Sequence, residues 1–396
     1  MEKLKKYIWC IAIGILCIIA FIVRFDAINK VKNVSGSDMR NYHNMANNFI
    51  ENGILGYSYD GMATEPNAHI TPGYPLFLAA IYSVFGENEV EDMYAVKIVQ
   101  TVLSTLTVLF VFLIGKKIGN NFVGLIAAMF MVIYPTFLIV ATLHLTETTY
   151  IFLFVFYLYV QLIAFDNNKK WIHFITGIIF GLAVMVRPVI FPMFLVIYLY
   201  KWIVNSEKRA IKGLLFFVLG LLIIMIPWWI RNIVLFNDFI ILCTQTGNPM
   251  LAGAYPPEFA PKSYPPIEEQ FDAAIEAIIT GFAEHPREYL KWFTIDKFKL
   301  IFGKMYLIGF MPELKFMIKI HNICVCVGGV SALFGLFRKN INVLSLYVIM
   351  LIIAHLLSVP EARYAMTIMP LLMLLTAYIF VHILRSLWEK LTYKKC

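Results

Sequence analysis

The stretch YIWCIAIGILCIIAFIV, residues 7–23, is an unbroken apolar run near the amino terminus. Three lysines precede it, and the charged residues Arg24 and Asp26 follow it directly. A cleaved signal peptide would end in small residues of the Ala-x-Ala kind, and this run does not. We therefore expect residues 7–23 to form an uncleaved first membrane span, with the basic amino terminus in the cytoplasm.

The rest of the chain has the composition of a membrane protein. Of its 396 residues, 60% are hydrophobic and 15% are charged, and the mean hydropathy is +0.74. A soluble domain has roughly 45–50% apolar and about 25% charged residues. We expect one integral membrane domain over residues 1–396. The net charge of +8 does not indicate a nucleic-acid partner, because most lysines and arginines lie between apolar segments, where they set orientation.

Further apolar segments of about the length of a span follow the first one. They are residues 94–114, 122–143, 149–165, 171–186, 189–204, 211–230, 321–337, 341–359 and 364–384. The basic turns at 116–117, 166–170 and 207–209 all fall on the cytoplasmic side if the first span runs outward. This pattern agrees with the enrichment of Lys and Arg in cytoplasmic loops.

Residues 298–311 are ambiguous, because Lys299 and Lys304 interrupt an otherwise apolar segment. If this segment crossed the membrane, the basic turn at 338–339 and the basic tail at 385–395 would lie outside. If it lies flat or re-enters, both become cytoplasmic. We therefore predict an all-α polytopic membrane protein, a bundle of about ten spans with both termini in the cytoplasm.

This topology leaves two large loops on the outer side, at about residues 24–93 and 231–319. Within the first, residues 76–85 are apolar but only about half as long as a span, which suits an interfacial helix. The second is rich in Pro and Tyr, and residues 273–282 have a helical pattern. Both outer loops are therefore expected to carry short helices at the membrane surface.

The first outer loop contains a polar helix that we expect to hold the chemistry. Ser37 has the side chain of an N-cap, and Asp38 in the first turn suits the positive end of the helix dipole. Asp38, Tyr42 and Ala46 are spaced i, i+4, i+8 and share one face. The alternative is that Asp38 is only a helix cap.

Several charged residues lie at the outer ends of predicted spans. Glu147, Arg187 and Arg231 all fall on the side that holds Asp38. A charge costs roughly 2.5–3.5 kcal/mol at mid-bilayer on insertion scales, and less at the interface. Ordinary capping and snorkelling are the alternative explanation for these residues. His69 could be a ligand or an acid/base group, although an isolated histidine is more often a hydrogen-bonded structural residue.

Six short motifs occur along the chain. They are Asp38 with Tyr42, Pro72-Gly-Tyr-Pro75, Thr146-Glu147, Arg187-Pro188, Pro227-Trp-Trp-Ile-Arg231-Asn232 and Glu361-Ala-Arg363-Tyr364. In this order they resemble the GT-C membrane glycosyltransferases, specifically the branch of protein O-mannosyltransferases and lipid A aminoarabinose transferases. One departure is that many relatives have an adjacent acidic pair in the first loop, whereas Asp38 is flanked by Ser37 and Met39.

The resemblance implies transfer of a sugar from a polyprenyl phosphate donor to a lipid, glycan or protein acceptor at the outer face of the cell membrane. Such a reaction needs a base for the acceptor's proton, and Asp38 is the candidate. It also needs a cation for the leaving phosphate, and Arg363 is the first candidate and Arg231 the second. The predicted substrate-binding residues are Tyr42, His69, Glu147, Arg187, Arg231, Arg363 and Tyr364.

We assign no metal ligands, although a divalent metal is possible. Asp38, Glu147 and His69 could hold such an ion together, but they are dispersed single residues. The six cysteines are also scattered and indicate neither a disulfide framework nor a zinc site.

The rival function is a transporter or flippase of a lipid-linked saccharide. Transporters tend to place ionisable groups and broken helices near mid-bilayer, often in paired repeats. Here the polar residues gather on one side, in two long loops, which favours chemistry at the membrane surface. The sequence identifies neither the sugar nor the acceptor.

Overall fold

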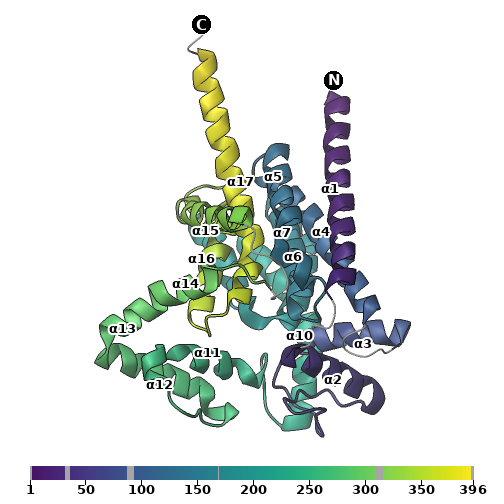
Figure 1. The fold of residues 1–396 in the computed structure, drawn as a ribbon, viewed down its shortest axis with the longest axis vertical. Coiled ribbons are helices and arrows are strands. Elements are labelled where there is room, and N and C mark those ends of the chain that lie inside the picture. Colours follow the sequence, from purple (N-terminus) through teal and green to yellow (C-terminus); the bar gives the residue numbers. More distant parts are fainter. Residues whose placement is uncertain (1, 32–35, 87–92, 168, 308–314, 394–396) are drawn as a thin grey trace.

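A computed structural model of the protein describes residues 2–31, 36–86, 93–167, 169–307 and 315–393. Within these ranges the chain is built from helices and connecting loops, without strands, so the predicted all-α class is confirmed (Figure 1). The helices of the central bundle are α1 (Glu2–Lys30), α4 (Tyr94–Ile118), α5 (Asn121–Ile133), α7 (Thr146–Asn167), α8 (Lys170–Val186), α9 (Met193–Ile203), α10 (Arg209–Phe236), α15 (Lys315–Gly335), α16 (Asn342–Leu356) and α17 (Ala362–Tyr393).

The bundle has the helices of a membrane protein. In the described ranges, six helices, α1, α4, α7, α10, α15 and α17, are long and apolar enough to cross a bilayer. The other bundle helices are shorter and apolar. α17 is the central helix, because its side chains from Ala365 to Tyr378 are almost all buried. The predicted number of about ten spans stays a prediction.

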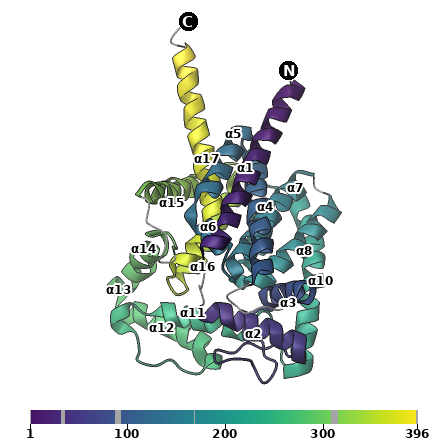
Figure 2. The same ribbon diagram turned by 45° about the vertical axis from the view of Figure 1, so that its right-hand side comes forward.

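Both ends of the chain lie at one end of the molecule (Figures 1 and 2). The short helices of the two loops that we predict to be outer lie at the other end, below the bundle in both views. They are α2 (Ser37–Asn52), α3 (Gly73–Phe85), α11 (Gly247–Ala254), α12 (Gln270–Glu284) and α13 (Pro286–Lys291). Asp38 and Tyr42, which lie in α2, are therefore at the end that carries these helices.

The first helix is longer than predicted. α1 continues through Arg24 to Lys30, and the Arg24 side chain is fully buried. Its guanidinium donates to Ser104 Oγ at 2.7 Å and to the carbonyl oxygens of Ala20 at 3.2 Å and Met131 at 2.9 Å. These polar partners satisfy a charge that would otherwise be costly to bury, so Arg24 does not end the helix.

The predicted span over residues 122–143 is not one continuous helix. α5 ends at Ile133, and a short helix, α6 (Pro135–Val140), follows it. Pro135 explains the break, because a proline removes a backbone donor and holds the residue before it in an extended conformation. Tyr134 is indeed extended, with φ −75° and ψ 113°.

Two further expectations concern short segments. α2 begins at Ser37 itself, after an extended Gly36, and no side-chain cap hydrogen bond is formed, so the assignment of Ser37 as N-cap was wrong. The ambiguous segment 298–311 is helical only to Phe302, the end of α14 (Lys297–Phe302), and its residues 308–311 lie outside the described ranges. A helix of this length is too short to cross a bilayer, which needs about 20 residues.

α8 and α10 pack with their backbones almost in contact. A Cβ atom on Gly177 would lie 1.9 Å from the carbonyl oxygen of Phe217, and one on Gly220 would lie 2.0 Å from that of Phe174. Small residues allow such close packing between membrane helices, where apolar burial alone gives little attraction. The contact fixes α8, whose last turn leads directly to Arg187.

Candidate active site

Asp38 and Arg363 form an ion pair between two helices that are far apart in the sequence. Arg363 lies in the first turn of α17 and Asp38 in the first turn of α2, 325 residues away. The Arg363 Nη1 atom donates to Asp38 Oδ2 at 2.7 Å. The side chains are 27% and 33% exposed, respectively, so solvent and ligands can reach both.

Glu147 and Arg187 form a second ion pair, which is much more buried. The Arg187 Nη1 atom donates to Glu147 Oε1 at 2.8 Å, and the two side chains are 16% and 2% exposed. Glu147 lies in the first turn of α7, where a carboxylate suits the helix dipole. Arg187 follows α8 in an extended conformation, with φ −144°, as expected for a residue that precedes a proline.

The two pairs belong to one cluster. The guanidinium carbons of Arg187 and Arg363 lie 5.3 and 5.7 Å from the ring centroid of Tyr364, which therefore faces two cations. Tyr42 lies within the field of both pairs. Burial raises the pKa of Tyr42, the carboxylates of Asp38 and Glu147 raise it further, and Arg187 lowers it. The phenol therefore stays protonated and able to donate a hydrogen bond.

Tyr42 is held by a chain of contacts that reaches the start of α7. Its ring packs edge-on against Tyr74, with centroids 5.3 Å apart. The Tyr74 hydroxyl donates to Gln100 Oε1 at 3.0 Å, and Gln100 Nε2 donates to the carbonyl oxygens of Leu143 at 2.7 Å and Ala141 at 3.2 Å. Gln100 thus fixes the turn that leads to Glu147. Tyr74 belongs to the motif at residues 72–75 but was predicted to have no role of its own, and Gln100 was not predicted at all.

The turn before Arg363 is held from the second outer loop. The Val359 amide donates to the Pro249 carbonyl at 2.7 Å. Lys297, which is fully buried, donates through Nζ to the carbonyl oxygens of Leu356 at 2.6 Å and Ser358 at 3.0 Å. Its ammonium also lies 4.1 Å from the ring centroid of Phe293. Burial lowers the pKa of Lys297 to about 7. This residue, too, was missed by the sequence analysis.

Arg231 joins α10 to the first loop and His69 joins the first loop to the second, and their hydrogen bonds are not with the ion pairs. Arg231 Nη2 donates to the Leu55 carbonyl at 2.6 Å, and Nη1 donates to Asn232 Oδ1 at 2.9 Å. The carbonyl of His69 accepts from the Gln245 amide at 3.1 Å, which connects the two outer loops. Both residues thus hold the first loop in place.

The structure does not gather the proposed metal ligands. Among the described residues, no three His, Cys, Asp or Glu side chains are placed to hold one metal ion. Asp38 and Glu147 are instead paired with different arginines, and His69 is not grouped with them.

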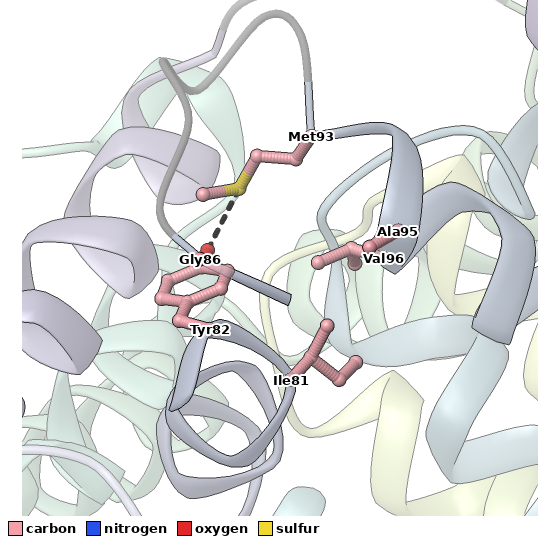
Figure 3. A pocket seen from close by; sticks show the side chains of 6 residues that line it. All are labelled: Ile81, Tyr82, Gly86, Met93, Ala95 and Val96. Carbon is pink, nitrogen blue, oxygen red and sulfur yellow. Dashed lines mark hydrogen bonds between the residues drawn. The ribbon is translucent and has the colours of Figure 1, made fainter. Parts of the chain in front are cut away.

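A small cavity between α3 and α4 is not a substrate site. Figure 3 shows Tyr82, whose hydroxyl donates to the sulfur of Met93 at 2.8 Å, beside Ile81 and Val96. The cavity measures about 10 Å³. That is about the space of one water molecule, so a sugar or a lipid headgroup does not fit there.

The chain is similar to known mannosyltransferases and oligosaccharyltransferases in sequence or fold. Residues 68–230 match the model of the family described as dolichyl-phosphate-mannose-protein mannosyltransferase. The fold is similar to the apo oligosaccharyltransferase of Archaeoglobus fulgidus, with a TM-score of 0.62 and 16% identity over 99% of this chain and 53% of that one. No curated protein sequence matches this chain.

Two further GT-C structures are similar and contain lipid phosphates. Archaeal AglB from Archaeoglobus fulgidus, in complex with an inhibitory peptide and a dolichol-phosphate, has a TM-score of 0.58 and 16% identity over 98% of this chain and 52% of that one. ArnT from Cupriavidus metallidurans, bound to undecaprenyl phosphate, has a TM-score of 0.57 and 10% identity over 92% and 59%. The chain thus spans about half the length of the structures it matches.

Only one of the two ion pairs lies within the residues that match the family model. Glu147 and Arg187 lie inside the matched residues 68–230, whereas Asp38 and Arg363 lie outside them. The more accessible pair is therefore formed by residues outside the family match.

Proposed function

We propose that the protein transfers a sugar from a polyprenyl phosphate donor to an acceptor at the outer membrane face, with Asp38 as the general base and Arg363 on the phosphate. The Asp38–Arg363 pair carries this proposal, because it places a carboxylate and a phosphate-binding cation together at an accessible point of the bundle's outer end. The similar structures that hold dolichol-phosphate and undecaprenyl phosphate support a lipid phosphate as the ligand.

Arg363 has hydrogen-bonding capacity left for a second anion. A guanidinium has five N–H donors, and the contact with Asp38 uses one, on Nη1. In the described part of the chain, the buried Nε of Arg363 has no hydrogen-bond partner. Leaving a buried donor unpaired costs roughly 1–3 kcal/mol. A phosphate that binds this guanidinium through two oxygens would use the fork geometry that lysine lacks.

The proposed reaction is a single displacement. Asp38 takes the proton of the acceptor's hydroxyl or amine as that atom attacks the anomeric carbon of the donor sugar. The bond from this carbon to the phosphate oxygen breaks, and its electron pair stays on the leaving lipid phosphate. Arg363 releases part of its contact with Asp38 and stabilises the new negative charge. A positioned base contributes roughly 10²–10⁴-fold to the rate.

The remaining residues have positioning roles in this proposal. Glu147 holds Arg187 against the ring of Tyr364. In this proposal, Glu147 and Arg187 order the hydroxyls of the donor sugar. Tyr42 offers a protonated phenol on the same face of α2 as Asp38. Arg231 is a weaker candidate than Arg363 for the phosphate, because two of its nitrogens already donate to Leu55 and Asn232.

We also propose that the chain crosses the membrane about ten times, with both termini cytoplasmic. The six long helices, together with α5–α6, α8, α16 and the pair η1 (Pro188–Ile190) and α9, would supply these spans. Labelling with an impermeant thiol reagent tests the orientation, in a background without Cys243. Glu258→Cys should react from outside and Lys339→Cys should not. External reaction at position 339 would contradict the topology.

The activity is tested with the protein in vesicles and a set of radiolabelled polyprenyl phosphate sugars. Transfer predicts that label leaves the lipid and appears on an acceptor or in water. The rival function, a transporter or flippase, predicts that the intact donor changes leaflet without losing its sugar. Movement without release, for every donor in the set, would overturn the proposed function.

A further inference from the structure

The second outer loop contains a groove that the proposed chemistry does not use. It lies along α12, between α13 and the segment from Tyr255 to Phe259, and measures about 360 Å³. Small-molecule sites occupy roughly 300–1,000 Å³, so this groove is large enough for a ligand, unlike the cavity beside Tyr82. Figure 1 places α12 at the same end of the molecule as α2.

The floor of the groove is smooth and apolar. Ala273, Ala277 and Gly281 line it and follow one another at i, i+4 and i+8, on one face of α12. The ring of Tyr289 lies directly on this face, since a Cβ atom on Gly281 would be 1.9 Å from the Tyr289 Cζ atom. A glycine is therefore required there, and a flat ring closes one side of the groove.

Aromatic rings form the wall of the groove. Phe259 stacks on His285, with centroids 4.5 Å apart and an angle of 20° between the rings. Phe259 also lies 6.1 Å from Tyr289, and Tyr255 lines the same space. Rings of this kind offer flat apolar faces together with polar edges. Such a wall suits a ligand with flat C–H faces.

Polar groups follow one another along the α12 side of the groove, at Glu276, Thr280 and Glu284. Glu276 and Glu284 both line it and are eight residues apart on α12, which is about 12 Å along the helix axis. Within the described ranges, neither carboxylate forms an ion pair. Ionised carboxylates only accept hydrogen bonds. The ligand should therefore be elongated and carry hydroxyl or amine donors toward both ends.

The helices around the groove are joined to the turn that carries Arg363. Trp292, which follows α13, donates through Nε1 to the Gly253 carbonyl at 3.0 Å. A Cβ atom on Gly253 would lie 2.3 Å from the carbonyl oxygen of Ser358, so α11 packs directly on the turn. The helices that line the groove are thus packed against the turn that carries Arg363, the proposed phosphate-binding residue.

We propose that this groove binds a neutral oligosaccharide, and that this oligosaccharide is the acceptor. Sugar rings have flat C–H faces for the aromatic wall and small-residue floor, and rims of hydroxyl groups for the two carboxylates and Thr280. The role as acceptor rests on the proposed function, whereas the binding does not. An amine-bearing ligand would also complement two carboxylates, and the experiment separates the two.

The test measures binding of the detergent-solubilised full chain to an array of neutral tri- to hexasaccharides and matched amine-bearing saccharides. Binding to neutral members is expected. The double variant Glu276→Gln/Glu284→Gln and the variant Tyr255→Ala should each weaken it by roughly 10-fold or more, because hydrogen bonds to charged groups and ring contacts are lost. Glu268→Gln/Glu288→Gln makes the same charge change outside the lining and should bind as the parent does.

Each other outcome is decisive. Parent-like binding by the groove variants, binding only to amine-bearing saccharides, or no binding to any saccharide would overturn the groove assignment. A parent chain that binds neutral oligosaccharides in the groove but releases sugar from no polyprenyl phosphate donor would contradict the proposed function and leave the groove assignment standing. With an active donor, the groove variants should raise the KM for the bound oligosaccharide as acceptor.

Discussion

The two ion pairs of the cluster are built alike but differ in exposure. Each joins a carboxylate in the first turn of a helix to Nη1 of an arginine, at 2.7 Å for Asp38 and 2.8 Å for Glu147. The Asp38 side chain is 33% exposed, and that of Glu147 only 2%. An accessible pair can exchange partners with a substrate, whereas a buried pair that loses one partner leaves an uncompensated charge. We therefore assign the chemistry to the Asp38 pair and positioning to the Glu147 pair.

The largest effect is expected from Asp38→Asn. The amide keeps the size of the side chain and an oxygen for Arg363, but it cannot take the acceptor's proton. The transfer rate should fall by roughly 10²-fold or more, about 2.7 kcal/mol in activation free energy. Thermal unfolding and yield should match the parent, which shows that the loss is chemical. Near-normal transfer would remove Asp38 from the proposed role.

Arg363 is expected to act mainly on the donor. Arg363→Ala should raise the KM for the polyprenyl phosphate sugar by roughly 10-fold or more, because charge-assisted hydrogen bonds to the phosphate are lost. Arg363→Lys keeps the charge without the planar fork, so its effect should be smaller but measurable. Arg385→Ala, in the exposed end of the same helix, is the control. If Arg363→Ala uses the donor normally, the phosphate binds elsewhere.

Glu147→Gln measures the buried pair and should lower activity less than Asp38→Asn. The neutral amide is a weaker hydrogen-bond partner for Arg187, which is largely buried. The free energy of unfolding should therefore fall by roughly 1–3 kcal/mol. The transfer rate of the folded fraction should drop by less than about 10-fold, since no proton passes through Glu147. If it drops as far as in Asp38→Asn at unchanged stability, both carboxylates take part in the chemistry.

The sequence predicts the components of this site better than their pairing. The apolar runs identify the bundle, and Asp38, Glu147, Arg187 and Arg363 can be found as charges beside spans. Which carboxylate meets which arginine depends on packing across 325 and 40 residues, and no local pattern encodes it. The separate roles of the two pairs follow only from their burial.

Other features differ from the sequence prediction for local physical reasons. Pro135 is a sequence signal for a helix break, but the apolar residues around it led to the prediction of one span over 122–143. Helix α1 continues past Arg24 because the side chain finds partners in Ser104 of α4 and Met131 of α5. The sequence of the first span alone cannot show these partners. Gln100 was missed for a similar reason, since a single amide in an apolar helix carries no periodic signal.

The smallest effect is expected from substitution of Lys297, which holds the turn before Arg363 through the Leu356 and Ser358 carbonyls. Burial holds its pKa at about 7 in the folded chain, against about 10.4 in an unfolded one. Between these values the unfolded chain binds more protons, so the parent should gain stability as pH rises from 7 toward 10. Below pH 7 both states are protonated and this contribution stays constant.

Lys297→Met removes the titrating group but keeps much of the packing against Phe293. The difference in Tm between pH 7 and pH 9 should therefore be smaller in the variant than in the parent, by a few degrees at most. Lys299→Met, two residues along the same helix and exposed, should keep the parent's pH dependence. An equal pH dependence in Lys297→Met would mean that Lys297 does not titrate in this range. Lys297 would then stay charged between pH 7 and pH 9 and keep its hydrogen bonds to the Leu356 and Ser358 carbonyls. The turn that carries Arg363 would in that case not respond to pH.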